Sequence, residues 1–562
     1  MKKYLQTGLL ILSTSACTVS YSEDLKRNNI GKQLKADVCV YGASGAGINA
    51  AVAVAREGFS VVIVEPTRTI GGMMATGFRM QQDAPSGTHL GGLTLGYYLR
   101  DLDIVDIRHG QGAAKENMAI MQSMIDDYSK LITVITNHRL ASVNKSSNGV
   151  ISEAMFEFAP ADKNGVPIPM KASDYLTEVR AKVFIDASYE GDLMAFSGVA
   201  YRVGKESRKA YGESLAGIVV TERFPGVDPY VEKGNPRSGL LSCIPTDPLG
   251  KEGDSSRFFN GYNFKLAFEM SPSEKYPGIP IAAPDKKNGD IYELLKRYTE
   301  AGYSLGWPSE NWSGLMSAGM QVDYPDGDWT ARSRIWQGYV DLIKTLCDFT
   351  GKKVRFLSNQ NEETNGWPDH LYTRSGRRMV GEYVMTQKDI QLQTEAPTPV
   401  GLGYYCVDIY ANRLVVLDDG TLAREGSMFA LVSPGPYQIP YGAIIPKKDE
   451  CKNLLVSVCM SASHVAYASV RMEATYMVMG EATGVAAALA VKTNKAVQDI
   501  DRKALTLLLK KYGQKVKWDG KGFRRFRFNV LNPRSYIGGK MSIRWETNPE
   551  EYSSCPIDVL WK

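Results

Sequence analysis

The stretch VYGASGAGINAA, Val40–Ala51, places three glycines and a serine directly behind a short apolar run. One interpretation is a nucleophile elbow, with Ser44 exposed on a sharp turn between a strand and a helix. That motif reads G-x-S-x-G, but Ala46 stands where its last glycine belongs, and no sequence signal marks a catalytic triad. The other interpretation is a nucleotide-binding turn, G-x-G-x-x-G, filled by Gly42, Ser44 and Gly47. Serine weakens this motif, yet it is small enough to leave clearance for a pyrophosphate.

The segments around this turn favour the nucleotide-binding interpretation. Residues 37–41, 45–57 and 60–64 predict a strand, a helix and a second strand, a unit typical of parallel sheets. The helix would begin at Gly45 and offer its free N–H groups and partial positive charge to a bound anion.

Two features beyond the second strand support the same interpretation. Glu65 follows the glycine turn by about 20 residues, where an acidic side chain binds ribose hydroxyls. Gly71 and Gly72 come next and permit a close approach between backbone and ligand. The sequence therefore predicts an α/β fold with a dinucleotide site, and a redox enzyme rather than a hydrolase.

Further strands are expected after this unit. Residues 132–158 predict a β-hairpin whose turn is the polar run NKSSNG. Residues 181–188 predict another strand, which carries Asp186 near its end. Asp186 and the nearby Glu190 either lie beside a cofactor or form and cap the turn that follows the strand.

A late strand and helix predict that the chain returns to its first unit. Residues 453–460 predict a buried strand and residues 471–491 a long helix. Gly480 and Gly484 lie on one face of that helix and can contact either a cofactor or another helix. Such a return is typical of a discontinuous flavin-binding domain, so we expect FAD rather than NAD.

The length of the chain indicates more than one domain, and its charge bears on the partners it can bind. At 562 residues the chain exceeds one hydrophobic core, and a net charge of +5 without a basic block gives no indication of nucleic-acid binding. The middle of the chain is rich in Tyr, Trp, Pro and Gly and is expected to face the substrate. The expected divisions are a signal peptide at 1–22, a linker at 23–35, an FAD-binding domain in two parts at 36–205 and 441–500, an inserted α+β substrate domain at 206–440, and a C-terminal helix and β tail at 501–562.

The N-terminus has the pattern of an export signal. MKKYLQTGLLILSTSAC, Met1–Cys17, has a basic start, a short apolar run and small residues before the cysteine. Cys17 is a candidate for lipid attachment, although Thr14 stands where a lipobox usually has leucine, and cleavage without a lipid is the alternative. We expect a protein exported to the periplasm or bacterial cell envelope. No later apolar run is expected to reach the roughly 20 residues of a membrane span.

Metal and disulfide chemistry are not expected. The eight cysteines include no C-x-x-C pair, and the five histidines are scattered. Cys39 and Cys459 lie in apolar runs that predict buried strands.

Several stretches resemble a bacterial family of FAD-dependent oxidoreductases, sometimes labelled xanthan-lyase-related, whose flavin domain is similar to that of heterodisulfide reductase A subunits. The matching stretches are YGASGAGINAAVAVAREG (41–58), VEPTRTIGGMMATG (64–77), VFIDASYEGDLMAFSGV (183–199), NGWPDHLYTRSGRRMVGEYVMTQKD (365–389) and residues 439–488. The resemblance spans most of residues 36–500. It implies a glutathione-reductase-like Rossmann fold that binds FAD noncovalently.

The sequence departs from the family pattern in identifiable places. Ser44 replaces glycine, and Glu481 stands where glutamine is usual. Tyr410, after Asp408, occupies a place often held by histidine, so an acid–base role for that pair does not carry over. Relatives with iron–sulfur clusters have cysteine motifs that are absent here, so no cluster is expected.

The resemblance implies that the turn from Met460 to His464 lies beside the isoalloxazine ring, so Met460 and Ser461 are expected to contact the cofactor. His464 is the first candidate for general base, because imidazole titrates near neutral pH. The alternative is a histidine that is hydrogen-bonded within the turn. Arg471 is a further catalytic candidate, although it could instead pair with Glu473 on the helix face.

Arginine and aromatic side chains of the middle region could bind the substrate. Arg374 and Arg378 are expected to share one helical face and could bind a carboxylate or sugar hydroxyls. A solvated, salt-bridged face is the alternative. Trp307, Trp312 and Trp367 could stack on sugar rings or belong to the core.

The resulting hypothesis is an exported FAD enzyme that oxidises a hydroxyl of a carbohydrate or related small molecule, with His464 taking the proton. The electron acceptor is unknown. One rival is a flavin-dependent reductase or monooxygenase acting on an unsaturated or aromatic substrate. The other is a carbohydrate-binding or lyase-type envelope protein with a vestigial nucleotide site.

Overall fold

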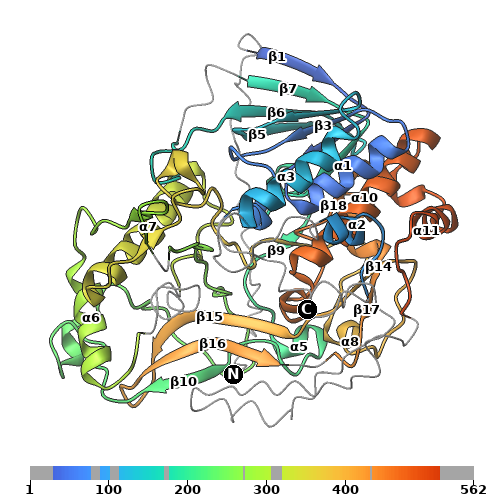
Figure 1. Cartoon of the computed structure of the whole chain (residues 1–562). Helices are drawn as coiled ribbons and strands as arrows, with labels where there is room; N and C mark the ends of the chain where they lie inside the picture. The colour runs from blue at the N-terminus through green and yellow to red at the C-terminus, as the bar shows by residue number, and fades with distance from the viewer. Residues whose placement is uncertain are drawn as a thin grey trace, which may run out of the picture.

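The computed structural model describes residues 30–76, 89–100, 113–169, 176–269, 272–305, 319–430 and 433–518 (Figure 1). Outside these residues lie the expected signal peptide with Cys17, the linker up to residue 29, Trp307, Trp312 and the expected C-terminal β tail.

A five-stranded parallel sheet organises the first half of the fold. Its strands, in spatial order, are β18 (Leu454–Val456), β8 (Val183–Asp186), β2 (Val38–Tyr41), β3 (Val61–Val64) and β4 (Ile132–Ile135). The late strand β18 pairs with β8, with Val456 beside Asp186. Segments from both ends of the chain thus share one sheet, as predicted for a discontinuous Rossmann fold.

Both faces of this sheet are buried. Val38 and Val40 face a core shared with helices, whereas Cys39 and Tyr41 face a second sheet. Apolar residues at every position are what a parallel strand covered on both faces requires. Cys39 lies in β2 as expected, but Cys459 lies just beyond β18, and both are free thiols.

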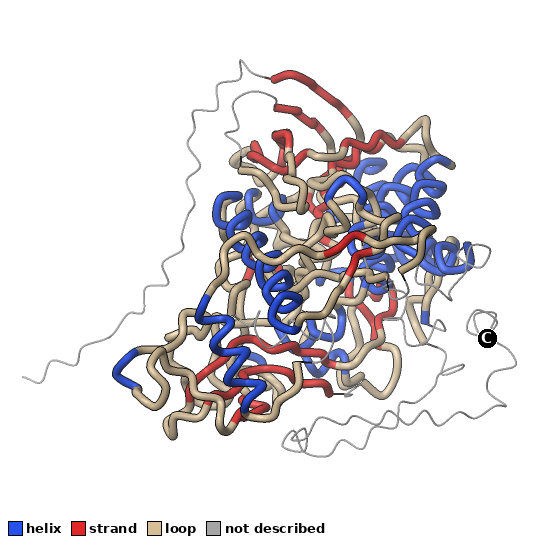
Figure 2. The backbone as a smooth tube through the Cα atoms, turned by 60° about the vertical axis from the view of Figure 1, so that its left-hand side comes forward, coloured by secondary structure: helices blue, strands red, loops and turns tan. Residues whose placement is uncertain are grey.

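Helices cover one face of the parallel sheet. They are α1 (Gly45–Arg56), α2 (Gly92–Arg100), α3 (Ala113–Asp126) and α10 (Glu473–Thr493). Helices α1 and α10 lie side by side (Figure 1). Figure 2 shows a group of helices beside the strands in the upper part of the molecule. A Cβ atom on Gly480 would lie 2.1 Å from the carbonyl oxygen of Ala46, and one on Gly484 would lie 2.3 Å from that of Ala50. These two glycines were expected to contact the cofactor, but they allow two helices to pack instead.

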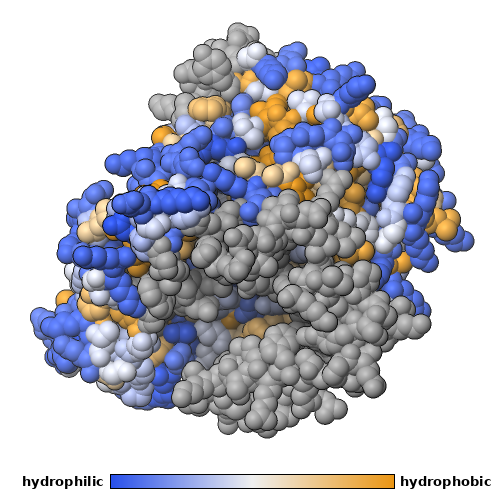
Figure 3. All heavy atoms as spheres, in the orientation of Figure 1, coloured by the Kyte–Doolittle hydropathy of each residue, from blue (hydrophilic) through white to orange (hydrophobic). Residues whose placement is uncertain are grey.

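Helix α10 corrects the expectation that no later apolar run is as long as a membrane span. Among the described residues it is the one helix long and apolar enough to cross a membrane, with a mean hydropathy of 1.3. However, 89% of its apolar segment is buried inside the protein. On the face shown in Figure 3, the described surface is mostly hydrophilic along its outer edge.

A four-stranded sheet covers the opposite face of the parallel sheet. Its order is β1 (Ile30–Lys35), β7 (Leu176–Arg180), β6 (Ile151–Phe158) and β5 (His138–Lys145). Strands β5 and β6 form the predicted hairpin, but the prediction that it starts at Ile132 was wrong. Residues 132–135 form β4 of the parallel sheet instead, because Asn137, at φ +56°, turns the chain from one sheet to the other.

The inserted region forms a separate part of the molecule, at the lower left of Figure 1. It contains α6 (Gly289–Glu300), α7 (Trp329–Thr350) and an antiparallel sheet of β10 (Val220–Phe224), β16 (Leu422–Ala430) and β15 (Val407–Val416). Its own apolar core includes Phe224, Trp336 and Leu346. Val400 and Tyr437 pack into the core of α1 and α10, so the two cores do not divide at residue 440.

The remaining helices and strands are short. The strand pairs are β9 (Tyr201–Arg202) with β13 (Arg378–Met379), β11 (Ile279–Pro280) with β12 (Arg355–Phe356), and β14 (Pro399–Gly403) with β17 (Tyr437–Pro440). The helices are α4 (Asp192–Phe196), α5 (Arg208–Tyr211), α8 (Gln387–Ile390), α9 (His464–Val470) and α11 (Arg502–Lys511).

Candidate active site

The glycine turn between β2 and α1 packs against the loop that follows β8. A Cβ atom on Gly42, at φ +96°, would lie 2.7 Å from the backbone of Ala187, and one on Gly47 would lie 1.9 Å from the carbonyl oxygen of Gly42. Both positions therefore require glycine. Ser44 caps α1, because its Oγ accepts a hydrogen bond from the N–H of Gly47 (3.3 Å) and donates one to the carbonyl of Ala187 (2.7 Å). The serine hydroxyl is thus used inside the turn.

A second glycine turn lies beside the first. The N–H of Gly71 donates to the carbonyl of Ala43 (2.7 Å), and both Gly71 and Gly72 have positive φ, +99° and +56°. A Cβ atom on Gly72 would lie 2.5 Å from the hydroxyl of Tyr189. The two turns therefore lie together, as a shared binding site requires. Gly45 differs, since its Cβ would meet the side chain of Met477 on α10 at 2.9 Å.

A cleft of about 710 Å³, partly open to solvent, runs along the first turn. Its lining includes Gly42, Ser44, Glu65, Arg68, Arg139, Ser188, Tyr189, Glu190, Tyr324, Trp329, Trp336, Asp369 and His370. The carboxyl ends of β2, β3 and β8 meet here, which is the usual ligand position in open α/β sheets.

Glu65 lies at the end of β3, as predicted. Its Oε2 accepts a hydrogen bond from the N–H of Ala43 (2.6 Å), and its Oε1 accepts from the N–H and the hydroxyl of Thr67 (2.8 and 2.7 Å). The carboxylate is therefore fixed between the glycine turn and the next loop, at the wall of the cleft.

Arg139 supplies a further polar group in the cleft. Its Nε donates to Glu157 (2.5 Å), its guanidinium lies 4.6 Å from the ring of Trp329, and its Nη2 has no hydrogen-bond partner. A buried donor without a partner is costly, so a ligand atom is expected there. Together with the N-terminus of α1, Gly42 and Glu65, this arrangement fits the ADP half of FAD.

Asp186 is hydrogen-bonded within the turn that follows β8, and its predicted contact with the cofactor stays a prediction. Its Oδ1 accepts from the N–H and the hydroxyl of Ser188 (3.0 and 2.7 Å), and its Oδ2 accepts from the N–H of Met194 (2.8 Å). Burial raises its pKa to about 6. Asp186 does not line the cleft, and it shapes the turn after β8, which was the alternative.

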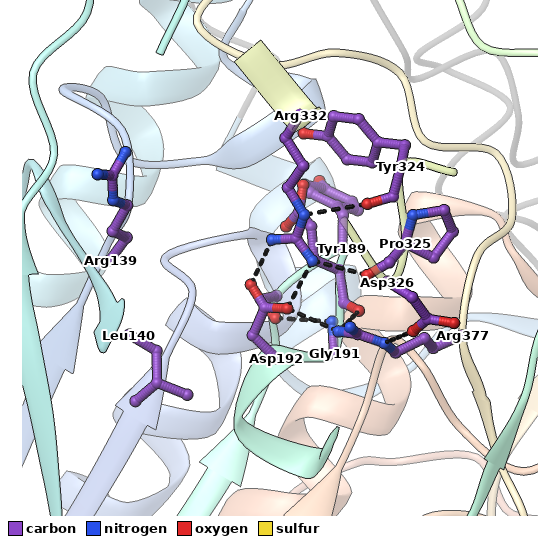
Figure 4. Close-up of polar contacts among 12 residues, drawn as sticks. Arg139, Leu140, Tyr189, Gly191, Asp192, Tyr324, Pro325, Asp326, Arg332 and Arg377 are labelled. Atoms are coloured by element: carbon purple, nitrogen blue, oxygen red, sulfur yellow. Dashed lines mark hydrogen bonds and ion pairs between the residues drawn. The ribbon is translucent and has the colours of Figure 1, made fainter. Parts of the chain in front are cut away.

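The end of the same loop is bound to the inserted region through Asp192. Figure 4 shows this carboxylate between Arg332, which donates two hydrogen bonds of 2.7 Å, and Arg377, which donates one of 2.6 Å. Burial alone would raise the pKa of Asp192, but the two guanidinium groups hold it below its usual value. The neighbouring Glu190 has no ion pair among the described residues, and burial raises its pKa to about 7.

The turn after β18 is buried against the segment that follows Arg378. The Oγ of Ser461 accepts from the N–H of Gly381 (3.0 Å), and its own N–H donates to the carbonyl of Ala443 (2.8 Å). Met460 is completely buried. Neither residue lines the cleft described above, so their contact with the cofactor stays a prediction.

His464 is the first residue of α9 and is only 2% exposed. Neither of its ring nitrogens has a hydrogen-bond partner in the described part of the chain, so the alternative of a histidine bonded within the turn is wrong. Its backbone N–H donates to Glu206 (2.9 Å). Burial, together with the charges of Arg378, Lys205 and Arg471, holds the pKa of His464 well below its ordinary value. The ring is therefore neutral at neutral pH.

Arg471 does not pair with Glu473. It forms an ion pair with Asp408 (3.0 Å) and donates to the hydroxyl of Tyr372 (3.0 Å), whereas Glu473 accepts from the hydroxyl of Tyr189 (3.0 Å). The expected pairing fails because α9 ends at Val470 and α10 begins at Glu473, so the two side chains do not share a helix.

Arg374 and Arg378 do not share a helical face either. Arg374 lies in a loop and Arg378 in β13, in a stretch whose Gly376 is a poor helix former. Arg378 pairs with Glu206 (2.8 Å). Both arginines are nevertheless buried, which excludes the alternative of a solvated face. Trp367 is also buried, in the core of the inserted region.

Two departures from the family pattern have a structural explanation. The ring of Tyr410 lies 3.7 Å from the guanidinium of Arg374 and covers it. Glu481 forms an ion pair with Arg56 (2.9 Å) and accepts from the N–H of Leu93 (2.8 Å), so it joins α10 to α1 and α2.

Sequence reasoning missed two residues of the site, Arg139 and Tyr189. The hydroxyl of Tyr189 accepts from the N–H of Met73 (2.9 Å) and donates to Glu473, so it connects the second glycine turn to α10. No local signal in β5 (HRLASVNK) distinguishes Arg139 from the other polar residues of that strand. Tyr189 stands between Asp186 and Glu190, both of which the sequence had singled out.

Solved structures show only distant likeness to this chain. A geranylgeranyl bacteriochlorophyll reductase-like protein from Thermoplasma acidophilum is 15% identical over 30% of this chain and 43% of its own, less than half its length, with a TM-score of 0.19. A THI4 protein from Thermovibrio ammonificans is 19% identical over 31% of this chain and 66% of its own, with a TM-score of 0.20. Quinol fumarate reductase from E. coli is 11% identical over 86% of this chain and 74% of its own, with a TM-score of 0.28. At these values the likenesses carry no argument about activity.

No curated protein matches the chain. The model of the FAD dependent oxidoreductase family, in contrast, matches residues 37–509. That range contains the parallel sheet, both glycine turns, the cleft and the late helices. The chain therefore belongs to the FAD-dependent oxidoreductase family, and its cofactor is FAD.

Proposed function

We propose that this enzyme oxidises a hydroxyl group of a carbohydrate or related small molecule, and that His464 accepts the hydroxyl proton. The observation that carries the proposal is the His464 ring, which is buried and yet has no partner at either nitrogen. A buried polar group without a partner is expected to meet a ligand.

Hydroxyl oxidation needs a proton acceptor, and the neutral ring of His464 offers two nitrogens for that role. Oxidation of a hydroxyl to a carbonyl releases one proton and one hydride, and bound FAD supplies the hydride acceptor. His464 is neutral and can take the proton at Nδ1 or Nε2.

One further feature supports a carbohydrate. Buried polar atoms of Asn260 and Thr373 have no hydrogen-bond partner within the described ranges, and a substrate rich in hydroxyls could satisfy such groups.

Anaerobic reduction of the FAD-loaded enzyme tests the proposal. A panel of sugars and sugar acids is mixed with the oxidised enzyme, and bleaching of the visible flavin band is followed. At least one member should bleach the flavin, and His464→Gln should slow that reaction by about 10²-fold or more, the usual contribution of a general base. His138→Gln, on β5 and outside the cleft lining, serves as the matched control and should react like the wild type.

Other outcomes would reject the proposal. A panel without any bleaching, combined with rapid reoxidation of chemically reduced enzyme by an alkene acceptor, would assign the enzyme to the reductase alternative. Equal rates in the wild type and His464→Gln would remove His464 from proton transfer while leaving hydroxyl oxidation in place.

We also propose, on sequence alone, that the protein is exported and that it belongs with a particular subgroup of its family. The N-terminal pattern supports export, with Cys17 as the possible lipid site. The quoted stretches support placement with xanthan-lyase-related members of the family. Mass spectrometry of the mature N-terminus in a native host checks the first proposal, since an N-terminus at Met1 would contradict it.

A further inference from the structure

Arg374 is a buried cation without a counter-charge. It is 2% exposed, and no carboxylate of the described residues lies within ion-pair distance of its guanidinium. Its Nη1 donates to the carbonyl of Gly261 (2.7 Å), but Nε and Nη2 have no hydrogen-bond partner among the residues that the structure describes. Burial of a charge without a partner is strongly unfavourable, so a ligand anion is the expected partner.

The two unpaired nitrogens of Arg374 lie on one edge of its guanidinium and can bind one ligand group together. Nε and Nη2 lie on the same edge of a guanidinium, and their parallel N–H bonds match the two oxygens of a carboxylate. The guanidinium is held in place by two rings, since it lies 3.7 Å from the ring of Tyr410 and 4.5 Å from that of Tyr372. The edge is therefore preorganised for a ligand.

A second arginine shares these tyrosines. Arg471 donates to the hydroxyl of Tyr372 (3.0 Å), and its guanidinium lies 5.8 Å from the ring of Tyr410. It is 3% exposed, and its Nε has no partner. Arg374 and Arg471 thus present three unpartnered N–H groups around one pair of aromatic rings.

We propose that Arg374 and Arg471 bind a carboxylate group of the substrate, so that the enzyme acts on hydroxy acids such as sugar acids rather than on neutral sugars. This inference rests on the proposed function, because it names the substrate class of the same site.

The charge balance favours a carboxylate over a phosphate. Arg471 is neutralised by Asp408, and Arg378 is neutralised by Glu206. Of these three arginines, Arg374 alone keeps an uncompensated charge and an unpaired guanidinium edge. A carboxylate carries one negative charge and two oxygens in a plane, whereas a phosphate at neutral pH carries more charge and a third oxygen.

The chain connects this group to the cofactor cleft by two short paths. His370 lines the cleft, and Tyr372 and Arg374 follow it closely in sequence. Tyr189 also lines the cleft and donates to Glu473, two residues beyond Arg471. Both arginines are thus joined to the cleft lining through a few residues of chain or a single hydrogen bond.

Calorimetric binding to the FAD-loaded, oxidised enzyme tests the inference under anaerobic conditions. The probes are glucuronate, glucose, acetate and inorganic phosphate. Glucuronate should bind at least about tenfold more tightly than glucose, and acetate should compete with it. Arg374→Gln should weaken glucuronate binding by about thirty-fold or more, as expected when one member of a buried charge pair is removed.

Two further variants separate a binding role from a structural one. Arg374→Lys keeps the charge but loses the planar edge, so its affinity for glucuronate should lie between those of the wild type and Arg374→Gln. Arg223→Gln removes a surface arginine that pairs with Asp419 and should bind glucuronate like the wild type. Bound FAD, measured by the visible spectrum, should be equal in all variants.

The outcomes distinguish the two proposals. Glucuronate and acetate binding that is absent, or equal in wild type and Arg374→Gln, would overturn the carboxylate site, and so would tighter Arg374-dependent binding of phosphate. If the glutamine variant fails to fold, the wild-type comparison of glucuronate with glucose still decides. Arg374-dependent carboxylate binding without flavin bleaching by any hydroxyl compound would support the site and reject the proposed function. Bleaching by neutral sugars at rates that are equal in the wild type and Arg374→Gln would support the proposed function and reject the carboxylate site.

Discussion

Two groups of buried charges include arginines of the segment from Arg374 to Arg378, and they differ in how completely their charges are paired. In the first, Asp192 is bound by Arg332 and Arg377, and Arg377 also pairs with Asp326 (2.9 Å). In the second, Arg374 has no carboxylate partner among the described residues.

The difference separates a structural role from a ligand-binding role. Asp192 follows β8, whereas Arg332 belongs to α7, so their ion pair holds the cleft loop to the inserted region (Figure 4). A complete set of partners leaves no atom for a ligand. The incomplete set around Arg374 is tolerable only if the cost of the buried charge is offset when a ligand binds.

The largest expected effect comes from breaking the fully paired group of Asp192, Arg332 and Arg377, here called the complete group. Asp192→Asn removes the charge that neutralises two buried guanidinium groups, so it should lower the free energy of unfolding by about 3–5 kcal/mol. Chemical denaturation of the FAD-loaded protein, followed by circular dichroism, measures the change.

An exposed ion pair provides the matched control. Asp419 pairs with Arg223, and their side chains are 55% and 52% exposed. Asp419→Asn should leave the denaturation midpoint unchanged, because solvent screens such pairs. A loss in Asp192→Asn no larger than in this control would mean that the complete group does not hold the loop.

The next effect concerns Glu190, which lies beside the complete group but has no ion pair of its own. Burial raises its pKa from 4.5 to about 7. The folded state therefore holds this proton more tightly than the unfolded state, and the associated stability is lost as pH rises from about 4.5 to about 7. Glu190→Gln has no proton to lose, so at about pH 8 it should be more stable than the wild type by up to about 3 kcal/mol.

The sign of this effect can be checked across pH. Below about pH 4 the stability difference between Glu190→Gln and the wild type should disappear, because both side chains are then neutral. Denaturation at several pH values measures it. A glutamine variant that is less stable than the wild type at high pH would show that the ionised carboxylate is stabilised in the folded protein.

A smaller effect is expected when the same substitution is made in each group. Arg374→Met replaces an unpaired buried charge by an apolar side chain of similar length, so stability without substrate should be unchanged or higher by about 1 kcal/mol. Arg332→Met should be destabilising, because it leaves Asp192 with one partner fewer. Thermal unfolding of both variants gives the comparison. Equal losses would place Arg374 among the structural residues.

Much of the fold could be predicted because its signals are local. The glycine turn, Glu65 and the apolar strands lie within one continuous stretch, and their spacing alone predicts the strand–helix–strand unit. The return of β18 and α10 was predictable from a buried strand followed by a long apolar helix. The start of the hairpin was not, because ITVI at 132–135 fits either sheet and only the backbone of Asn137 decides between them.

The site was less predictable because pairing depends on distant residues. Nothing near Arg374 in the sequence shows that Asp192 pairs with Arg377 rather than with Arg374. The expected pairing of Arg471 with Glu473 failed for the same reason, since Asp408 and Tyr189 come from other elements. Helical spacing also suggested a cofactor contact for Gly480 and Gly484, because a contact between two helices uses the same small residues as a cofactor site.

The smallest expected effect concerns Ser44, whose hydroxyl resembles the complete group because both of its hydrogen bonds are satisfied within the protein. Ser44→Gly restores the usual dinucleotide-binding turn and removes the cap of α1, which costs only a few tenths of a kcal/mol when glycine replaces serine. FAD affinity, measured by fluorescence titration of the apoprotein, should stay within about twofold of the wild type. A loss of tenfold or more would mean that the hydroxyl contacts the cofactor directly, and that Ser44 belongs with the ligand-binding groups after all.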